Sequence, residues 1–192
     1  MADFSIPRLV TARLVLRAPV AADFPVYAAL MASPRARFMG GPFDTRTAWG
    51  IFCHDIAQWS LFGHGALMMD LATSGVCVGQ VGINHGPLFP ERELGWLVYD
   101  GQEGHGYATE AARALRGWAA AGGIRGLVSY IDPGMTAPWR SLNDWVRRLT
   151  TSRHGRIHTI WCTAIRRKSV ARPRTSGLDG KYGRWCRRSG LN

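Results

Sequence analysis

A glycine-rich segment between two apolar stretches carries the clearest chemical signal in the sequence. It runs Gln102-Glu103-Gly104-His105-Gly106-Tyr107-Ala108-Thr109-Glu110 and leads directly into an alanine-rich stretch. Closely spaced glycines at the start of a helix allow successive backbone N–H groups to point outward together, and the helix dipole adds partial positive charge there. Such a loop suits a phosphate or diphosphate. Two glycines before a helix also occur in ordinary tight turns, so the spacing alone leaves both interpretations open.

The histidines and cysteines give no comparable signal. His154, His158 and Cys162 are spaced four residues apart, as ligands on one helix face would be, but Gly155 interrupts the helix and no fourth ligand is evident. The four cysteines include no CxxC pair, so neither a zinc site nor a disulfide framework is expected. We therefore predict no metal. Three further histidines are interpreted as surface or hydrogen-bonded core residues: His54, His64 and His85.

Hydrophobic periodicity predicts the elements that position the glycine-rich segment. Helices are predicted at 23–31, where Asp23 precedes an apolar stretch with Pro25 in the first turn, at 44–63, where Asp44 could cap and Gly63 ends the pattern, and at 107–121, where Gly122-Gly123 supplies the stop. Apolar residues at spacings of three and four form one face of the second helix: Trp49, Phe52, Cys53, Ile56 and Trp59. Strands are predicted at 13–17, 66–71, 76–83, 93–99 and 127–131. The short connections among the middle three favour antiparallel neighbours.

The glycine-rich segment resembles the acetyl-coenzyme A loop of the GNAT superfamily of N-acetyltransferases. In that family the loop has Arg or Gln, two residues, Gly, one residue, and then Gly or Ala. Gly106 and Ala108 match the last two positions. The run from Gly106 to Ala111 resembles the branch that contains the ribosomal-protein N-terminal acetyltransferases, as do residues 11–17, 93–96 and 129–133. The resemblance covers about residues 8–135 in the order of the family.

The resemblance implies an α/β (α+β) fold with a mixed, mostly antiparallel sheet flanked by helices. It implies transfer of the acetyl group of acetyl-CoA to a primary amine on a protein N-terminus or a small molecule. Glu93 is the expected general base, with Glu91 behind it, because the amine must lose a proton before it attacks the thioester. The pantetheine arm is expected along Leu97 and Val98, where two strands splay apart. The diphosphate is expected on Gly104, His105, Gly106, Tyr107, Ala108 and Thr109.

Two departures from the family pattern bear on activity. Glu103 stands where the family has Arg or Gln, and a carboxylate beside a diphosphate is repulsive. Either Glu103 turns to solvent, or Gln102 compensates. Met135 stands at the position of a common Asn, and no tyrosine follows Tyr130 until Tyr182, although the family uses a tyrosine there to protonate the leaving thiolate. A CoA-binding relative with impaired catalysis is therefore the alternative to an active enzyme.

The composition changes abruptly after about residue 135. Residues 1–135 hold ten basic and eleven acidic residues, a net charge of −1, whereas residues 136–192 hold fourteen basic and two acidic residues, a net charge of +12. We interpret 8–135 as a GNAT domain that lacks its usual C-terminal end, and 136–192 as an atypical, out-of-frame or disordered tail. The alternative is a basic extension that binds nucleic acid or the ribosome through its arginines.

No apolar run approaches the roughly 20 residues that a membrane span requires, and the N-terminus lacks a basic segment followed by an apolar one. The sequence therefore predicts a cytoplasmic protein with no membrane partner. Neither the acceptor amine nor the oligomeric state is indicated by the residue pattern.

Overall fold

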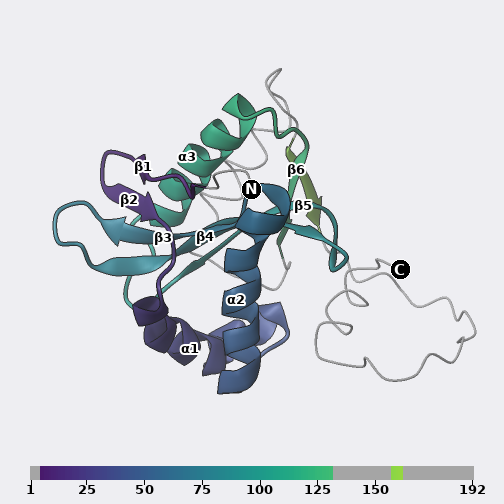
Figure 1. Cartoon of the computed structure of the whole chain (residues 1–192). Helices are drawn as coiled ribbons and strands as arrows, with labels where there is room; N and C mark the ends of the chain where they lie inside the picture. The colour runs from purple at the N-terminus through teal and green to yellow at the C-terminus, as the bar shows by residue number, and fades with distance from the viewer. Residues whose placement is uncertain (1–4, 132–156, 162–192) are drawn as a thin grey trace, which may run out of the picture.

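A mixed sheet forms the centre of the computed structural model, which describes residues 5–131 and 157–161. Its seven strands lie in chain order from one edge to the other (Figure 1). β1 to β5 pair antiparallel, and β5, β6 and β7 pair parallel. The strands are β1 (Leu9–Val10), β2 (Leu14–Arg17), β3 (Ala66–Leu71), β4 (Cys77–Gly86), β5 (Phe89–Val98), β6 (Leu127–Ile131) and β7 (Ile157–Trp161). This confirms the predicted fold class.

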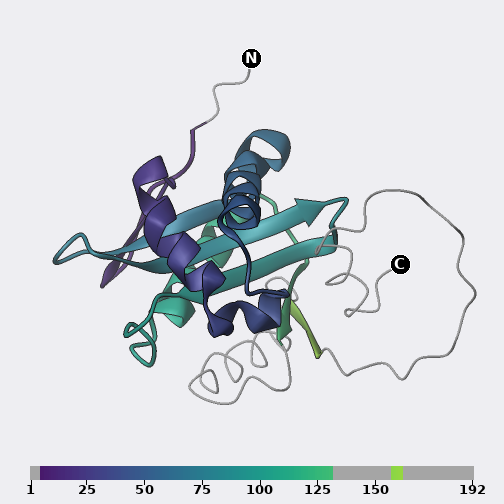
Figure 2. The same ribbon diagram turned by 90° about the horizontal axis from the view of Figure 1, so that it is seen from below.

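Helices cover both faces of the sheet (Figure 2). One face carries α1 (Phe24–Ala32) and α2 (Thr45–Phe62), and the other carries α3 (Tyr107–Ala121). Alternation along β3 explains the division, because Leu67 and Met69 point into the cluster under α3 while Met68 points into the cluster under α1 and α2. The described residues also include two short 3-10 helices: η1 (Ala21–Asp23) and η2 (Pro34–Met39).

The ends of the second helix follow the predicted signals, whereas its buried face does not. The Asp44 side chain accepts a hydrogen bond from the Thr47 amide at 2.7 Å, and Gly63 ends the helix in the left-handed conformation. The predicted apolar face was wrong in part, since Trp49 is 45% exposed. The buried stripe is instead Ala48, Phe52, Asp55, Gln58 and Trp59. Asp55 and Gln58 therefore occupy buried positions that a search for apolar residues alone does not find.

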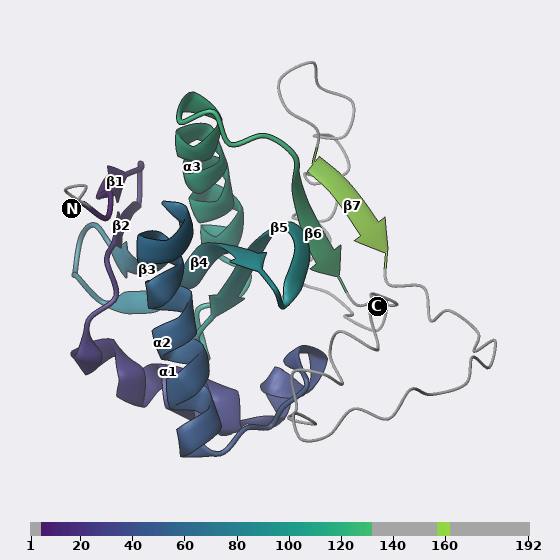
Figure 3. The ribbon, with the colours of Figure 1, turned by 45° about the vertical axis from the view of Figure 1, so that its right-hand side comes forward.

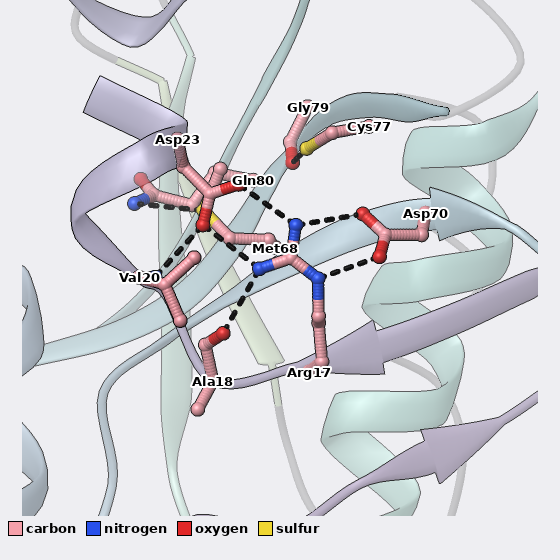
Figure 4. A network of polar contacts seen from close by, with 9 residues as sticks. All are labelled: Arg17, Ala18, Val20, Asp23, Met68, Asp70, Cys77, Gly79 and Gln80. Carbon is pink, nitrogen blue, oxygen red and sulfur yellow. Dashed lines mark hydrogen bonds and ion pairs between the residues drawn. The ribbon is translucent and has the colours of Figure 1, made fainter. Parts of the chain in front are cut away.

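Arg17 joins three elements at the start of the α1 and α2 layer (Figure 4). Its guanidinium donates to both carboxylate oxygens of Asp23 at 2.7 and 2.8 Å, and to Asp70 of β3 at 2.5 and 3.1 Å. Burial alone would raise the pKa of Asp23, but hydrogen bonds from Arg17 and from the Val20 amide lower it below its ordinary value. The network fixes the beginning of α1 against β2 and β3.

Replacing Arg17 with methionine is expected to lower the free energy of unfolding by about 3 kcal/mol near neutral pH, because two largely buried carboxylates lose their partner. Since the pKa of Asp23 is lowered in the folded protein, its contribution is fully present above its unfolded pKa of about 4 and is lost as pH falls through the folded value. Urea unfolding at pH 7, 4 and 3 should therefore show a deficit that is constant down to about pH 4 and shrinks below it.

The exposed Arg46 provides the matched control for that experiment. Arg46→Met removes the same charge from the surface of α2 and should change stability by no more than about 0.5 kcal/mol. A deficit in Arg17→Met that equals this control, or that stays constant with pH, would contradict the assigned role of the Arg17 network.

The last strand comes from the part of the sequence that was assigned to the tail. β7 lies beside β6 at the edge of the sheet opposite β1 and β2, with Leu127 opposite Ile157 and Ile131 opposite Trp161 (Figure 3). The division at residue 135 stays a prediction, as does the proposed role of the arginines in the tail. Met135 and Tyr182, like His154 and Cys162, lie outside the described residues.

Candidate functional site

The first turn of α3 presents backbone amides that the described residues do not cap. Gly106 is the N-cap residue, with φ of 78°, and it has no side chain to satisfy these amides. The first intrahelical bond runs from the Glu110 amide to the Gly106 carbonyl at 3.1 Å. The amides of Tyr107, Ala108 and Thr109 precede that bond and have no acceptor within the described part of the chain. They form a site where a negative charge would be stabilised by hydrogen bonds and the helix dipole.

Glu110 anchors this turn to the connection between β1 and β2. Its carboxylate accepts from the Thr11 hydroxyl at 2.6 Å, from the Arg13 amide at 2.9 Å and from the Arg13 guanidinium at 2.7 Å. Burial alone would raise the pKa of Glu110, but these hydrogen bonds and the charge of Arg13 lower it. Arg13 also lies over the Tyr107 ring and donates to the His105 carbonyl at 2.9 Å. The turn is thus held by a cation that itself lies beside the open amides.

Glu103 follows neither of the two alternatives predicted from the sequence. It does not turn freely to solvent, since its side chain is only 26% exposed, and its partner is not Gln102. It forms an ion pair with Arg35 of η2, which also pairs with Asp100 and donates to the Val98 carbonyl at 2.9 Å. An arginine more than sixty residues earlier in the chain therefore supplies the compensation.

β5 and β6 pair over only part of their lengths. Within the described residues their register contains two pairs, Arg92 with Leu127 and Glu93 with Val128. The Ser129 hydroxyl adds one bond to the Leu94 carbonyl at 2.7 Å. β5 continues to Val98 without a further β6 partner in that register. Because parallel strands have their carboxyl ends at the same edge, the separation opens towards the end of β5, from which the loop to α3 departs.

Leu97 and Val98, the residues predicted to line the pantetheine arm, lie on β5 beyond the last pair with β6. Leu97 packs against the cluster under α1 and α2, and Val98 belongs to the cluster under α3. Gly104, His105 and Gly106 are exposed in the loop, and Ala108 is buried against the core. The structure therefore brings both predicted groups to one end of the sheet.

Glu93 lies at the point where β5 and β6 begin to separate. Its side chain is 8% exposed, and its cross-strand neighbours are Asn84 on β4 and Val128 on β6. Alternation places it on the face of the sheet that carries α1 and α2, since Leu94 belongs to the cluster on the opposite face. Glu91, the second candidate, is exposed on the same strand.

Polar residues of α2 that the sequence analysis missed face the same side of the sheet. Asp55 is buried, which raises its pKa to about 7 despite a hydrogen bond from Tyr27. Gln58 contacts His54, with 2.8 Å between the two Nε2 atoms, and accepts from the His85 amide at 3.0 Å. Asp55 and Gln58 belong to the buried stripe of α2. Sequence analysis missed them because polar residues at these positions are also what a solvent-exposed helix face would carry.

His64 fits the predicted core role, and His85 lies within a strand. The ring of His64 is buried and bonds through Nδ1 to the Ile83 carbonyl at 3.0 Å. Burial lowers the pKa values of His54 and His64. His85 lies within β4, where the register with β5 shifts between Asn84 and Gly86. The part of the chain described here contains no cluster of three or more potential metal ligands.

Comparison with family models decides the classification. Residues 13–142 match the model described as the acetyltransferase (GNAT) domain. The chain belongs to the GNAT acetyltransferase family. The match begins at the predicted first strand and extends seven residues beyond the boundary placed at 135. A comparison with curated protein sequences finds no match to this chain.

Solved structures agree with the GNAT assignment. The chain is 55% identical to an acetyltransferase from Agrobacterium tumefaciens, with a TM-score of 0.69 over 77% of this chain and 85% of that one. It is 25% identical to a structure from Bordetella pertussis assigned to the GNAT acetyltransferases, with a TM-score of 0.61 over 74% and 87%. The ribosomal L7/L12 alpha-N-protein acetyltransferase RimL, solved with coenzyme A, shares the fold at 20% identity and a TM-score of 0.55 over 74% and 82%.

Membership of the GNAT family confirms the resemblance derived from the glycine-rich loop and the predicted mixed sheet. The roles of individual residues stay predictions. Among the helices that the structure describes, none has the length and apolar character that crossing a bilayer requires.

Proposed function

We propose that this chain transfers the acetyl group of acetyl-CoA to a primary amine. The observation that carries the proposal is the set of uncapped amides at Tyr107, Ala108 and Thr109, at the end of the sheet where β5 and β6 separate. A diphosphate needs several outward-facing N–H groups and positive potential, and the start of α3 supplies both. RimL, which has the same fold, was solved with coenzyme A.

The acyl carrier is proposed to lie along the end of β5. Its diphosphate would occupy Gly104 to Thr109, and its pantetheine arm would follow Leu97 and Val98 into the space between the two strands. From Val98 back to Glu93 an extended strand covers about 17 Å at roughly 3.3 Å per residue. That length suits a pantetheine arm, so the thioester would reach the neighbourhood of Glu93.

Glu93 is proposed as the general base. An ammonium group is not nucleophilic, so a carboxylate or a water bound to it must accept a proton before the nitrogen attacks the thioester carbonyl. The resulting tetrahedral intermediate has a negative oxygen, which a backbone N–H of β5 beside the thioester would stabilise. The intermediate then collapses, the C–S bond breaks, and the thiolate takes a proton. We assign no side chain to that last step.

The acceptor is proposed to be a protein N-terminus or a small-molecule amine. RimL acts on ribosomal L7/L12, which favours a protein N-terminus as the first candidate. A screen should therefore include peptides with free Ser, Ala or Met at the N-terminus, single amino acids, a polyamine and an aminoglycoside, each followed by release of free thiol.

Isothermal calorimetry with acetyl-CoA, followed by that screen, tests the proposal. Binding together with amine-dependent thiol release would support an acetyltransferase. Binding without thiol release from any acceptor would favour the alternative of a CoA-binding relative with impaired catalysis. Absence of acetyl-CoA binding in a folded sample would refute both.

A further inference from the structure

Arg35 connects η2 to the loop that leads into α3. Its backbone amide is held by the Ser33 hydroxyl at 3.2 Å, so the start of η2 fixes the base of the side chain. Its guanidinium then contacts Asp100, Glu103 and the Val98 carbonyl. Three successive parts of the chain around the end of β5 therefore depend on one side chain.

The two carboxylates that Arg35 contacts differ in their surroundings. The Asp100 side chain is 80% exposed, whereas that of Glu103 is 26% exposed. Solvent screens a charge at Asp100 effectively, but it screens one at Glu103 much less. Glu103 lies three residues before the N-cap of α3, so its charge opposes any anion at the open amides.

We propose that Arg35 is a positioning residue for the acyl carrier. It neutralises Glu103 and holds the 99–106 loop against η2, which keeps the start of α3 attractive to a diphosphate. Arg35 acts through Glu103 and the loop and does not itself contact the ligand. This inference rests on the proposed binding of acetyl-CoA.

A double-substitution cycle measured by calorimetry tests the proposal. Arg35→Gln should weaken acetyl-CoA binding about 10-fold, because Glu103 is left unpaired beside the diphosphate. Glu103→Gln alone should stay within about 3-fold of wild type, since it removes the repulsive carboxylate and leaves Arg35 paired with Asp100. The double variant Arg35→Gln with Glu103→Gln should recover binding to within about 3-fold. The 10-fold loss should also shrink between 50 and 500 mM NaCl.

Arg37 on the same 3-10 helix supplies the control. It is exposed and stacks on the neighbouring Phe38 ring, so Arg37→Gln changes the net charge equally without touching the loop. That variant should bind acetyl-CoA as wild type does. Thermal unfolding of each variant checks that the fold is retained.

The outcomes separate this inference from the proposed function. If wild type binds acetyl-CoA and Arg35→Gln binds it equally well, the role of Arg35 is overturned while the function stands. A double variant as weak as Arg35→Gln would also overturn it, because a direct contact with the ligand predicts no rescue. If wild type does not bind acetyl-CoA at all, the proposed function fails and this inference fails with it.

Discussion

Replacing Gly106 with aspartate is expected to weaken acetyl-CoA binding by roughly 100-fold or more. Gly106 is the exposed N-cap of α3, with a left-handed φ of 78°. An aspartate there brings a negative charge to the positive end of the helix and competes with the diphosphate for the same amides. Calorimetric titration of wild type and variant with acetyl-CoA measures the loss directly.

Gly75 offers a closely matched control for the substitution at Gly106. It has a φ of 72°, lies in the exposed turn between β3 and β4, and a Cβ added there would meet no atom within 4 Å. Gly75→Asp therefore introduces the same charge and a similar backbone strain of about 1–2 kcal/mol away from the loop. It should bind acetyl-CoA as wild type does. Equal affinity of Gly106→Asp and wild type would remove the site assignment.

Replacing Glu93 with glutamine is expected to reduce the rate of acetyl transfer by about 100-fold or more, while acetyl-CoA affinity changes little. The amide keeps the size of the side chain but accepts no proton at neutral pH. Glu93 is buried where β5 and β6 separate, so bulk water has limited access to replace it. Thiol release with the fastest acceptor from the screen gives the rate, and calorimetry gives the affinity.

Glu91→Gln distinguishes a specific base from a general loss of negative charge on β5. Glu91 is exposed, and its substitution should leave the rate within about 2-fold of wild type. The pH dependence of kcat should also lose its acidic limb in Glu93→Gln but not in Glu91→Gln. A rate in Glu93→Gln close to wild type would assign the proton transfer to another group.

Local signals were sufficient for most of the secondary structure and for the loop before α3. The third helix begins and ends at Tyr107 and Ala121, as its alanine-rich pattern and the following glycines indicated. The strand Leu127–Ile131 also matches its predicted bounds. In these two segments the local residue pattern and the tertiary contacts favour the same structure, so the pattern was enough to predict the bounds of the element.

The contacts that adjust the site are long-range, and no residue pattern indicated them. Arg35 compensates Glu103 only because η2 folds back against the end of β5, and no residue pattern predicted η2 itself. Asp55 is buried on α2 because its turn of helix faces the sheet, although an aspartate in an amphipathic pattern is ordinarily assigned to solvent. β7 pairs with β6 from within a strongly basic segment. The prediction for residues 136–192 was based on their overall composition, which does not reveal a strand of five residues within them.

The most direct test of the central claim is a nuclear magnetic resonance titration of the 15N-labelled protein with acetyl-CoA. If the open amides at the start of α3 hold the diphosphate, the signals of Gly104, Gly106 and Thr109 should shift in a saturable manner, together with those of Leu97 and Val98. The signal of Gly75 in its distant turn should stay in place. Saturable shifts confined to other parts of the chain, with the residues before α3 unmoved, would contradict the account.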